Sequence, residues 1–296
     1  MHPFVQPKSA TPLLVMAIAI FFVCNIASAS PPEETSPNVI DDALTTPRAV
    51  VADFNSDGHP DYVLGNPSTR QTAIWFLNNN VFIGSAFGPT IPASWNLEGA
   101  ADFNQDLHPD YALFQPNFNR TAIWYLSGPT LIGTAFGPTL PSNWELVTTG
   151  DFNGNSFPDY VLFNSNTRRT AIWYLVNNIF AGSDFGPTLP PGWNLIGVAD
   201  FNSDGHRDYL LLNAGNHQTA IWYLSGPTLI GTAFGPTITS GWSLVATADF
   251  NGDGHPDYLL YNPATRQTAI WYLNNNVFIG GAFGPTPPMG WSLVAP

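Results

Sequence analysis

Oxygen-bearing side chains recur at alternate positions of the segment DFNSDGHPD, residues 53–61. Asp53, Asn55, Asp57 and Asp61 occupy positions 1, 3, 5 and 9 of this segment, and a glycine occupies position 6. Alternate positions of a tight curve direct side chains to its inside, and the glycine permits the sharp turn. Calcium loops collect hard oxygen ligands in this way, including one backbone carbonyl. The segment therefore predicts a calcium-binding loop, with the carbonyl of position 7 as a further ligand.

The segment occurs five times at a constant spacing of 49 residues. The predicted ligand side chains are Asp53, Asn55, Asp57 and Asp61 in the first loop, Asp102, Asn104, Asp106 and Asp110 in the second, Asp151, Asn153, Asn155 and Asp159 in the third, Asp200, Asn202, Asp204 and Asp208 in the fourth, and Asp249, Asn251, Asp253 and Asp257 in the fifth. Asp-rich surface turns do not require the same ligand positions in five copies. The repetition therefore favours Ca²⁺ binding over turn chemistry alone.

The five loops differ in how well they match the pattern. The first, fourth and fifth are complete, whereas Leu107 replaces the turn glycine of the second loop. The third loop has Asn155 at position 5 and Ser156 at position 6, so it lacks one carboxylate and the glycine. We therefore predict three firm calcium sites, a weaker one in the second loop and the weakest in the third.

The acidic balance of the chain agrees with cation binding. Of the 21 acidic residues, 14 lie in the five loops, and the formal net charge is −13. Without a bound cation, the carboxylates within a loop repel one another, and Ca²⁺ ions relieve that repulsion. Nucleic acids bind basic surfaces, so this composition argues against a nucleic-acid partner.

Short strands must position these loops. In the fourth repeat, strand-like runs rich in β-branched and aromatic residues cover 194–201, 208–213, 219–224 and 227–234, with Gly, Pro, Asn or Asp between them. Four strands in a 49-residue repeat predict an all-β fold, a β-propeller of five four-stranded blades. A β-solenoid is the competing architecture, although its coils usually have shorter repeats.

The ends of the repeat region bear on ring closure. There are five acidic loops but six copies of the strand that precedes a loop, because residues 48–54 open the first repeat and residues 290–295 have no loop after them. The spare strand predicts a latch on the first blade and a closed ring in one chain. An open arc completed by a second chain is the alternative.

The sequence DFNSDGHPDYVLGNP, together with the motif AFGPT, resembles the FG-GAP or VCBS repeat of integrin-like calcium-binding β-propellers. The resemblance covers residues 48–296. It implies Ca²⁺ in the loop between the first two strands of each blade, and a role in adhesion or ligand binding. It does not specify the ligand, and an extracellular protein or a glycan is the expected partner.

The first 47 residues are expected to lie outside the propeller. An apolar run at residues 13–26, followed by the triplet ASA, has the layout of a secretory signal peptide, residues 1–29. The alternatives are an uncleaved membrane anchor and lipidation at Cys24. Residues 30–47 are rich in Pro, Ser, Thr and acids and predict a flexible leader. We therefore predict a secreted protein, extracellular or periplasmic, with no membrane span after cleavage.

Other recurrent residues have two interpretations each. Histidine at position 7 of four loops suggests a transition metal, but this position offers its carbonyl, so solvent-facing imidazoles are expected. All ten tryptophans occupy two repeat positions, represented by Trp75 and Trp95. Core packing between blades is favoured there over stacking on sugars. Arg70 and its equivalents favour a solvated turn over an anion clamp.

Catalysis has few candidate residues. Outside the loops and the leader the acids are Glu98, Glu145 and Asp184, which share no repeat position and form no evident acid–base pair. The common nucleophile and zinc-protease motifs are absent from the sequence. We therefore predict a non-enzymatic binding or adhesion module in which calcium is structural. A multivalent lectin with pockets between blades is the first alternative, and an enzyme with a loop-built site is the second.

Overall fold

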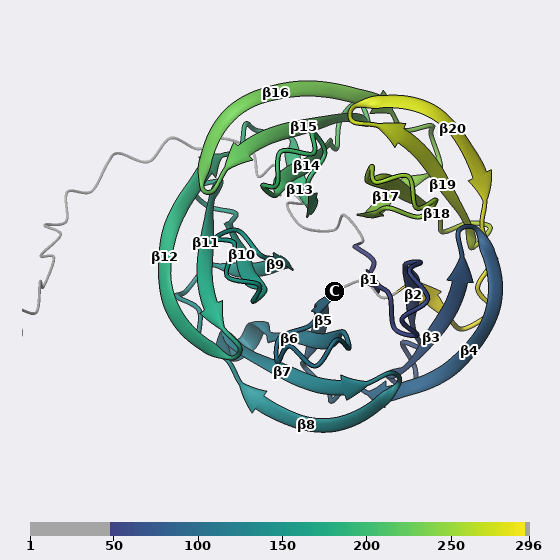
Figure 1. Cartoon of the computed structure of the whole chain (residues 1–296), viewed down its shortest axis with the longest axis horizontal. Coiled ribbons are helices and arrows are strands. Elements are labelled where there is room, and N and C mark those ends of the chain that lie inside the picture. Colours follow the sequence, from purple (N-terminus) through teal and green to yellow (C-terminus); the bar gives the residue numbers. More distant parts are fainter. Residues whose placement is uncertain (1–47, 294–296) are drawn as a thin grey trace, which may run out of the picture. The chain divides into compact units, whose positions relative to one another are not determined.

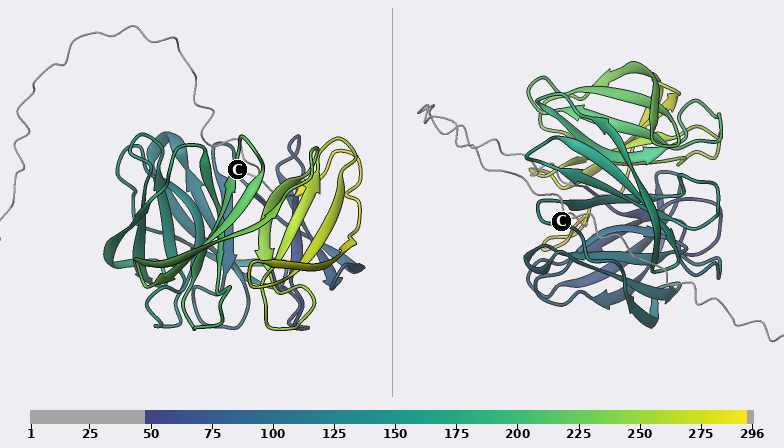
Figure 2. Two further views of the ribbon diagram at one scale, coloured as in Figure 1. Left: turned by 90° about the horizontal axis from the view of Figure 1, so that it is seen from above. Right: turned by 90° about the vertical axis from the view of Figure 1, so that its left-hand side faces the viewer.

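Residues 48–293 are described by a computed structural model, and they form five antiparallel sheets arranged as blades around a central channel (Figures 1 and 2). The predicted five-bladed β-propeller is confirmed, and a solenoid is excluded. The expected signal peptide, residues 1–29, and the leader, residues 30–47, lie outside the described residues. Within residues 48–293, no helix is long and apolar enough to span a membrane.

The strands of each blade follow one another in sequence order from the channel to the circumference (Figure 1). The innermost strands are β1 (Val51–Ala52), β5 (Asn96–Ala101), β9 (Glu145–Gly150), β13 (Trp193–Ala199) and β17 (Ser243–Ala248). The second strands are β2 (Asp61–Gly65), β6 (Asp110–Gln115), β10 (Asp159–Asn164), β14 (Asp208–Asn213) and β18 (Asp257–Asn262). The third strands are β3 (Gln71–Asn78), β7 (Arg120–Ser127), β11 (Arg169–Val176), β15 (Gln218–Ser225) and β19 (Gln267–Asn274). The outer strands are β4 (Val81–Thr90), β8 (Thr130–Phe136), β12 (Ile179–Thr188), β16 (Thr228–Thr237) and β20 (Val277–Phe283). A 3₁₀ helix, η1 (Pro116–Phe118), precedes β7, and β21 (Ser292–Leu293) follows the fifth blade.

The burial of each strand follows its composition. The second strands, such as β14 with the sequence DYLLLN, are buried along nearly their whole length because both faces pack against neighbouring blades. The outer strands are largely exposed on the circumference. Five clusters of buried side chains form the core, and each cluster combines residues of two adjacent blades. The core is therefore a ring of interfaces between blades.

The glycine of the GPT motif marks a close approach between blades. A Cβ atom added to Gly186 would lie 2.4 Å from Thr170 Oγ1 and 2.8 Å from the Tyr209 hydroxyl oxygen of the next blade. Its equivalents in the other blades have the same two neighbours; they are Gly88, Gly137, Gly235 and Gly284. Only glycine fits at this position, because any side chain would push apart two buried polar groups.

Blade 1 contains residues from both ends of the described chain. Leu293 of β21 pairs with Leu64, in the second half of β2. Val51 of β1 pairs with Tyr62, in the first half of the same strand. The innermost strand of blade 1 is therefore composite. The predicted latch and the closed ring within one chain are confirmed, and an arc completed by a second chain is excluded.

Candidate functional site

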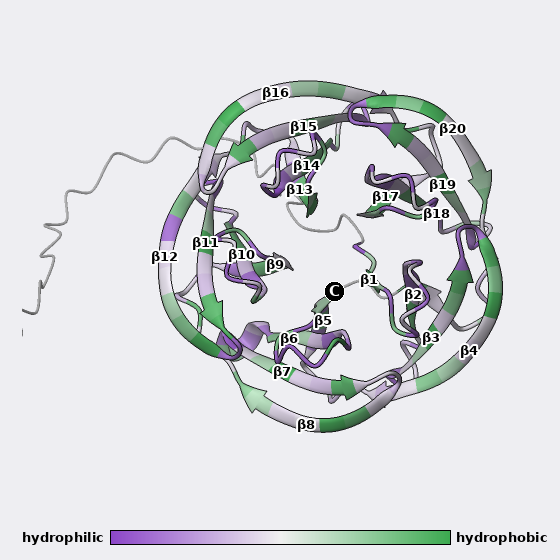
Figure 3. Ribbon diagram, viewed as in Figure 1, coloured by the Kyte–Doolittle hydropathy of each residue, from purple (hydrophilic) through white to green (hydrophobic). Residues whose placement is uncertain are grey.

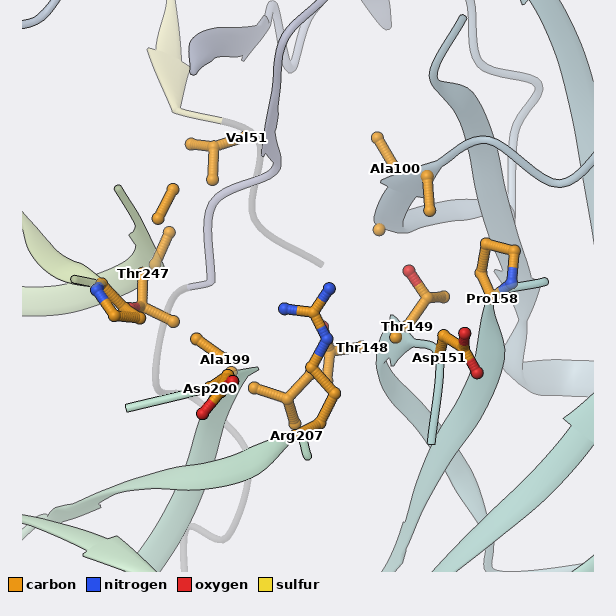
Figure 4. A pocket seen from close by; sticks show the side chains of 18 of the residues that line it. Val51, Ala100, Thr148, Thr149, Asp151, Pro158, Ala199, Asp200, Arg207 and Thr247 are labelled. Atoms are coloured by element: carbon orange, nitrogen blue, oxygen red, sulfur yellow. The ribbon is translucent and has the colours of Figure 1, made fainter. Parts of the chain in front are cut away.

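The five acidic loops join the first and second strands of the blades and gather at one end of the channel. The position-1 aspartates of the second to fifth loops line one cavity of about 920 Å³, called the vestibule below (Figure 4). Its walls come from the innermost strands of all five blades. The fold therefore brings the predicted ligand loops around a common opening.

Hydrogen bonds to the loop backbone hold the predicted ligands of the first loop. The Asp57 and Gly58 amides donate to the two carboxylate oxygens of Asp53, at 3.1 and 2.8 Å. The Asp57 amide also donates to Asn55 Oδ1 at 3.2 Å. The His59 amide donates to Asp57 Oδ1 at 3.0 Å. The oxygens of positions 1, 3 and 5 therefore face the inside of one tight curve, as the alternation predicts.

Asp61, at position 9, is fully buried behind the loop. One of its carboxylate oxygens accepts the Phe54 amide and the other accepts the Leu77 amide of β3, both at 2.9 Å. The same pair of bonds, at 2.9–3.1 Å, recurs for the other position-9 residues, Asp110, Asp159, Asp208 and Asp257. Each position-9 aspartate thus ties its loop to the third strand, a role that the sequence pattern did not reveal.

The position-9 carboxyls lie in a region of concentrated negative charge. Burial raises the pKa of Asp61 to about 6 and that of Asp257 to about 7, although two backbone hydrogen bonds lower each value. The carboxylates at positions 5 and 1 of the same loop raise these pKa values further. A bound cation relieves such a concentration of charge.

The turn at position 6 has a positive φ angle in every loop. The angle is 88° at Gly58, 87° at Gly205 and 86° at Gly254. It is 71° at Leu107 and 69° at Ser156. A residue with a Cβ atom is strained in this conformation by about 1–2 kcal/mol. The replacement of the turn glycine therefore leaves backbone strain in both the second and the third loop.

The third loop differs from the others at position 5. The side-chain amide of Asn155 donates to the Leu175 carbonyl of β11 at 3.3 Å, a bond that an aspartate cannot make. Asn155 Oδ1 accepts the Phe157 amide at 2.8 Å, as Asp57 accepts the position-7 amide in the first loop. The third loop therefore keeps its shape with one carboxylate fewer.

The donor set of the loops suits a hard cation. Each loop presents carboxylate and amide oxygens and no sulfur, which is the preference of Ca²⁺ and not of soft transition metals. Within residues 48–293, no three His, Cys, Asp or Glu side chains converge into a metal cluster by themselves. Calcium loops also draw ligands from Asn side chains and a backbone carbonyl, and both occur at the expected positions.

The position-7 histidines are more enclosed than expected. The Nδ1 atoms of His59, His108 and His255 are buried and have no hydrogen-bond partner among the described residues. His206, in the fourth loop, is exposed. His59, His108 and His255 are partly exposed, so the expectation of solvent-facing imidazoles is met fully in the fourth loop and only in part in the other three.

The vestibule contains polar residues that do not follow the repeat. Arg207 stands where the other four loops have proline, and its guanidinium extends into the cavity (Figure 4). Thr148, Thr149 and Thr247 line the walls. Arg207 is not among the residues predicted from the sequence. Its departure from a proline position in a regular repeat is the signal that identifies it.

A buried ion pair borders the vestibule. Glu98 is the bulge residue of β5, and the bulges of the third, fourth and fifth innermost strands hold Val or Ile instead. Arg48 donates to Glu98 at 3.4 Å, and the Glu98 side chain is 3% exposed. Burial raises the pKa of Glu98 to about 7, Arg48 lowers it, and nearby Glu145 raises it. The fold thus brings together two acids that the sequence did not pair.

The tryptophans lie at the junctions between blades. Each junction contains one tryptophan from the linker before a blade and one from the third strand of that blade. Both tryptophans are partly buried and pack against the same core cluster. The predicted core packing is therefore confirmed for the buried part of each tryptophan side chain. The linker tryptophans also contact an exposed phenylalanine of the outer strand.

The recurrent arginines before the third strands hold these linkers in place. Arg70 Nε donates to the Ile91 carbonyl at 2.9 Å, and its terminal nitrogen donates to the Trp95 carbonyl. Arg168 donates to the Trp193 carbonyl in the same way. Arg266 Nε donates to the Pro287 carbonyl at 3.2 Å. The expectation of a solvated turn is therefore wrong at all three positions, because the guanidinium groups bind backbone carbonyls.

Comparison with known families classifies this arrangement. The model of the FG-GAP-like repeat matches residues 53–113 and 200–260, and each match begins at position 1 of an acidic loop. Residues 53–113 and 200–260 of this five-bladed β-propeller are FG-GAP-like repeats. Each matched part of the FG-GAP propeller continues through the second, third and outer strands into the next blade. The resemblance seen in the sequence is therefore confirmed.

Solved structures similar to this FG-GAP propeller have low sequence identity to it. A protein of unknown function from Bacteroides caccae is 10% identical, with a TM-score of 0.43 over 75% of this chain and 72% of that one. A member of the DUF4221 family from Bacteroides vulgatus is 10% identical, with a TM-score of 0.45 over 81% and 82%. The Photorhabdus luminescens Tc holotoxin pore is 15% identical, with a TM-score of 0.43 over 86% of this chain and 12% of that one. A search of the curated proteins found no match.

Proposed function

We propose that this FG-GAP propeller is a secreted, non-enzymatic binding or adhesion module whose fold is stabilised by calcium. The observation that carries the proposal is one loop geometry, repeated in five blades, that combines oxygen donors at positions 1, 3 and 5 with a buried carboxylate at position 9. In the first loop Asp53, Asn55, Asp57 and Asp61 would hold the ion, with the position-7 carbonyl, and their equivalents would do so in the other loops. Bound Ca²⁺ supplies positive charge and a rigid cross-link.

Such a cross-link would replace the disulfides that often stabilise secreted proteins. The chain has one cysteine, so it cannot form an internal disulfide. Asp61 already connects the loop backbone to β3, so an ion on this loop would stabilise the loop and two strands together. When the free calcium concentration is one hundred times the Kd of a site, binding at that site raises the free energy of unfolding by about 2.7 kcal/mol.

The vestibule favours binding over catalysis. Glu98 is 3% exposed and is paired with Arg48, so it is poorly placed to exchange a proton with a ligand. Arg207 and the three threonines offer hydrogen bonds to a ligand that enters from the loop side. An enzyme with a loop-built site is therefore the less favoured function.

A lectin with pockets between blades is the second candidate. The tryptophan and phenylalanine rings at the five blade junctions favour it, because partly exposed aromatic side chains offer an apolar face beside polar groups. An extracellular protein partner would instead use one face of the ring.

Thermal unfolding of the purified protein at rising calcium, with excess EDTA as the reference, tests the proposal. We expect the melting temperature to rise with calcium, and calorimetry to count three to five bound ions. Asp57→Asn gives the first loop the position-5 residue of the third, so it should weaken one site and leave the others unchanged. A melting temperature independent of calcium, together with no bound ion, would refute the proposal.

A further inference from the structure

The ten tryptophans of the chain lie at five equivalent blade junctions, and the junction before blade 3 encloses a pocket between its aromatic rings. Each junction is called an aromatic cleft below. Each cleft combines a linker tryptophan, a third-strand tryptophan and an outer-strand phenylalanine. The five aromatic clefts are Trp291, Trp75 and Phe87; Trp95, Trp124 and Phe136; Trp144, Trp173 and Phe185; Trp193, Trp222 and Phe234; and Trp242, Trp271 and Phe283. No tryptophan of the chain lies elsewhere.

The phenylalanines of these clefts are unusually exposed for aromatic residues. Their exposed fractions are 59–70% in all five blades. Each ring centroid lies 6.1–6.3 Å from that of the linker tryptophan, and the two planes are within 28–34° of parallel. Apolar stretches along the outer strands are visible in Figure 3. Together with the other exposed apolar side chains of the outer strands, these rings form apolar surface of the kind that is typical of interaction sites.

The cleft before blade 3 is the best formed. Trp144, Trp173 and Phe185 line a pocket of about 320 Å³ together with Pro141 and Ser183. This volume falls in the range of small-ligand pockets, about 300–1,000 Å³. A single sugar ring fits such a space, whereas an extended peptide needs a longer groove.

Polar side chains border each cleft. The residue paired with the third-strand tryptophan is a serine, a threonine or a glycine; in chain order these are Ser85, Thr134, Ser183, Thr232 and Gly281. The first residue of each third strand is a long polar one: Gln71, Arg120, Arg169, Gln218 and Gln267. The Arg169 guanidinium carbon lies 3.7 Å from the Phe185 ring centroid, which shows that this position reaches the cleft. At the cleft before blade 3, apolar faces and hydrogen-bonding groups therefore adjoin, as sugar recognition requires.

We infer that the five aromatic clefts are equivalent sites for neutral saccharides, an inference that rests on the proposed binding function and names its ligand class. The formal net charge of −13 disfavours acidic glycans. The outer strands that carry the five phenylalanines follow one another around the ring (Figure 1), so one membrane plane or one protein face would meet only a few of the clefts. A branched glycan can reach around the ring and engage several clefts at once, which multiplies weak affinities by about 10²–10⁴.

Tryptophan fluorescence reads out the clefts directly, because every tryptophan of the chain belongs to one. The purified protein, at saturating calcium, is titrated with cellopentaose, whose glucose rings have flat apolar C–H faces, and with an acidic pentagalacturonate. We expect cellopentaose to change the emission and calorimetry to count up to five sites. Pentagalacturonate should bind more weakly to the cleft before blade 3, because it carries the same sign of charge as Asp184, which also lines that pocket.

Substitutions of the exposed phenylalanines test the clefts without removing buried side chains on which folding depends. Phe234→Ala removes the most exposed of the five rings, at 70%, and should lower the affinity of its own cleft about tenfold. The matched control is Ile230→Ala, which removes an exposed side chain of the same outer strand outside the clefts. Replacing all five phenylalanines should abolish multivalent binding while the calcium-dependent rise in melting temperature remains.

Three results would overturn the inference. The first is no response to cellopentaose by the calcium-loaded, folded protein. The second is cellopentaose binding by the fivefold phenylalanine variant that equals binding by Ile230→Ala. The third is preferential binding of pentagalacturonate or of a proline-rich peptide. The calcium-dependent melting temperature separates this failure from failure of the proposed function. If the melting temperature still rises with calcium but no sugar binds, the saccharide sites are refuted and the calcium-stabilised binding module is not. If the rise with calcium is absent as well, the proposed function is also refuted.

Discussion

Replacing Glu98 by glutamine should stabilise the propeller at neutral and alkaline pH. Glu98 is buried where other blades place Val or Ile, and burial raises its pKa from 4.5 to about 7 despite the Arg48 partner. A carboxyl with a raised folded-state pKa contributes stability that is complete below pH 4.5 and is lost as pH rises through 7. A shift of this size corresponds to about 3 kcal/mol at 25 °C. Glutamine keeps an oxygen for Arg48 and does not ionise.

The measurement is urea unfolding of the wild type and of Glu98→Gln at several pH values between 4 and 8.5, at one calcium concentration. Titration of the calcium loops is common to both proteins and cancels in the difference. The variant should match the wild type near pH 4 and exceed it by about 3 kcal/mol near pH 8, which raises the melting temperature by about 6–12 °C. Asp184→Asn, an exposed carboxylate, serves as the control. A difference that does not change with pH would refute the reasoning.

Four further predictions concern the loops and the blade interface. Asp208→Ala leaves the Phe201 and Leu224 amides unpaired, so it should lower the free energy of unfolding by at least about 2 kcal/mol even in EDTA; a loss seen only with calcium would contradict this. Leu107→Gly relieves a left-handed conformation and should raise the free energy of unfolding in EDTA by about 1 kcal/mol, measured by urea titration. Asn155→Asp adds a carboxylate to the third loop, so calorimetry should show tighter calcium binding there; unchanged binding isotherms would exclude this site. Gly186→Ala forces a Cβ atom against Thr170 and should lower stability by about 1–3 kcal/mol, and an unchanged melting curve would show that the interface can relax.

The local pattern predicts those parts of this protein that depend on neighbours in sequence. The 49-residue period and the turn residues between strands predicted the blades. The spacing of Asp53, Asn55 and Asp57 predicted that their side chains lie on the inside of the curved loop. The second hydrogen bond of Asp61 reaches residue 77, and its donor becomes visible only once β2 pairs with β3. Arg48 meets Glu98 only once blades 1 and 2 pack side by side. Contacts of that kind require the folded topology, which a repeat pattern does not contain.

The composite innermost strand of blade 1 gives the ring a seam. Two residues from each end, Val51–Ala52 and Ser292–Leu293, form that strand, whereas β5 has six residues and β13 has seven. Backbone amides of blade 1 should therefore exchange their hydrogens fastest, since opening begins where the fewest ladder bonds must break. A released β21 uncovers an edge of β2 that the same segment of a second molecule can occupy. High concentration combined with partial opening should therefore produce domain-swapped dimers joined at this seam.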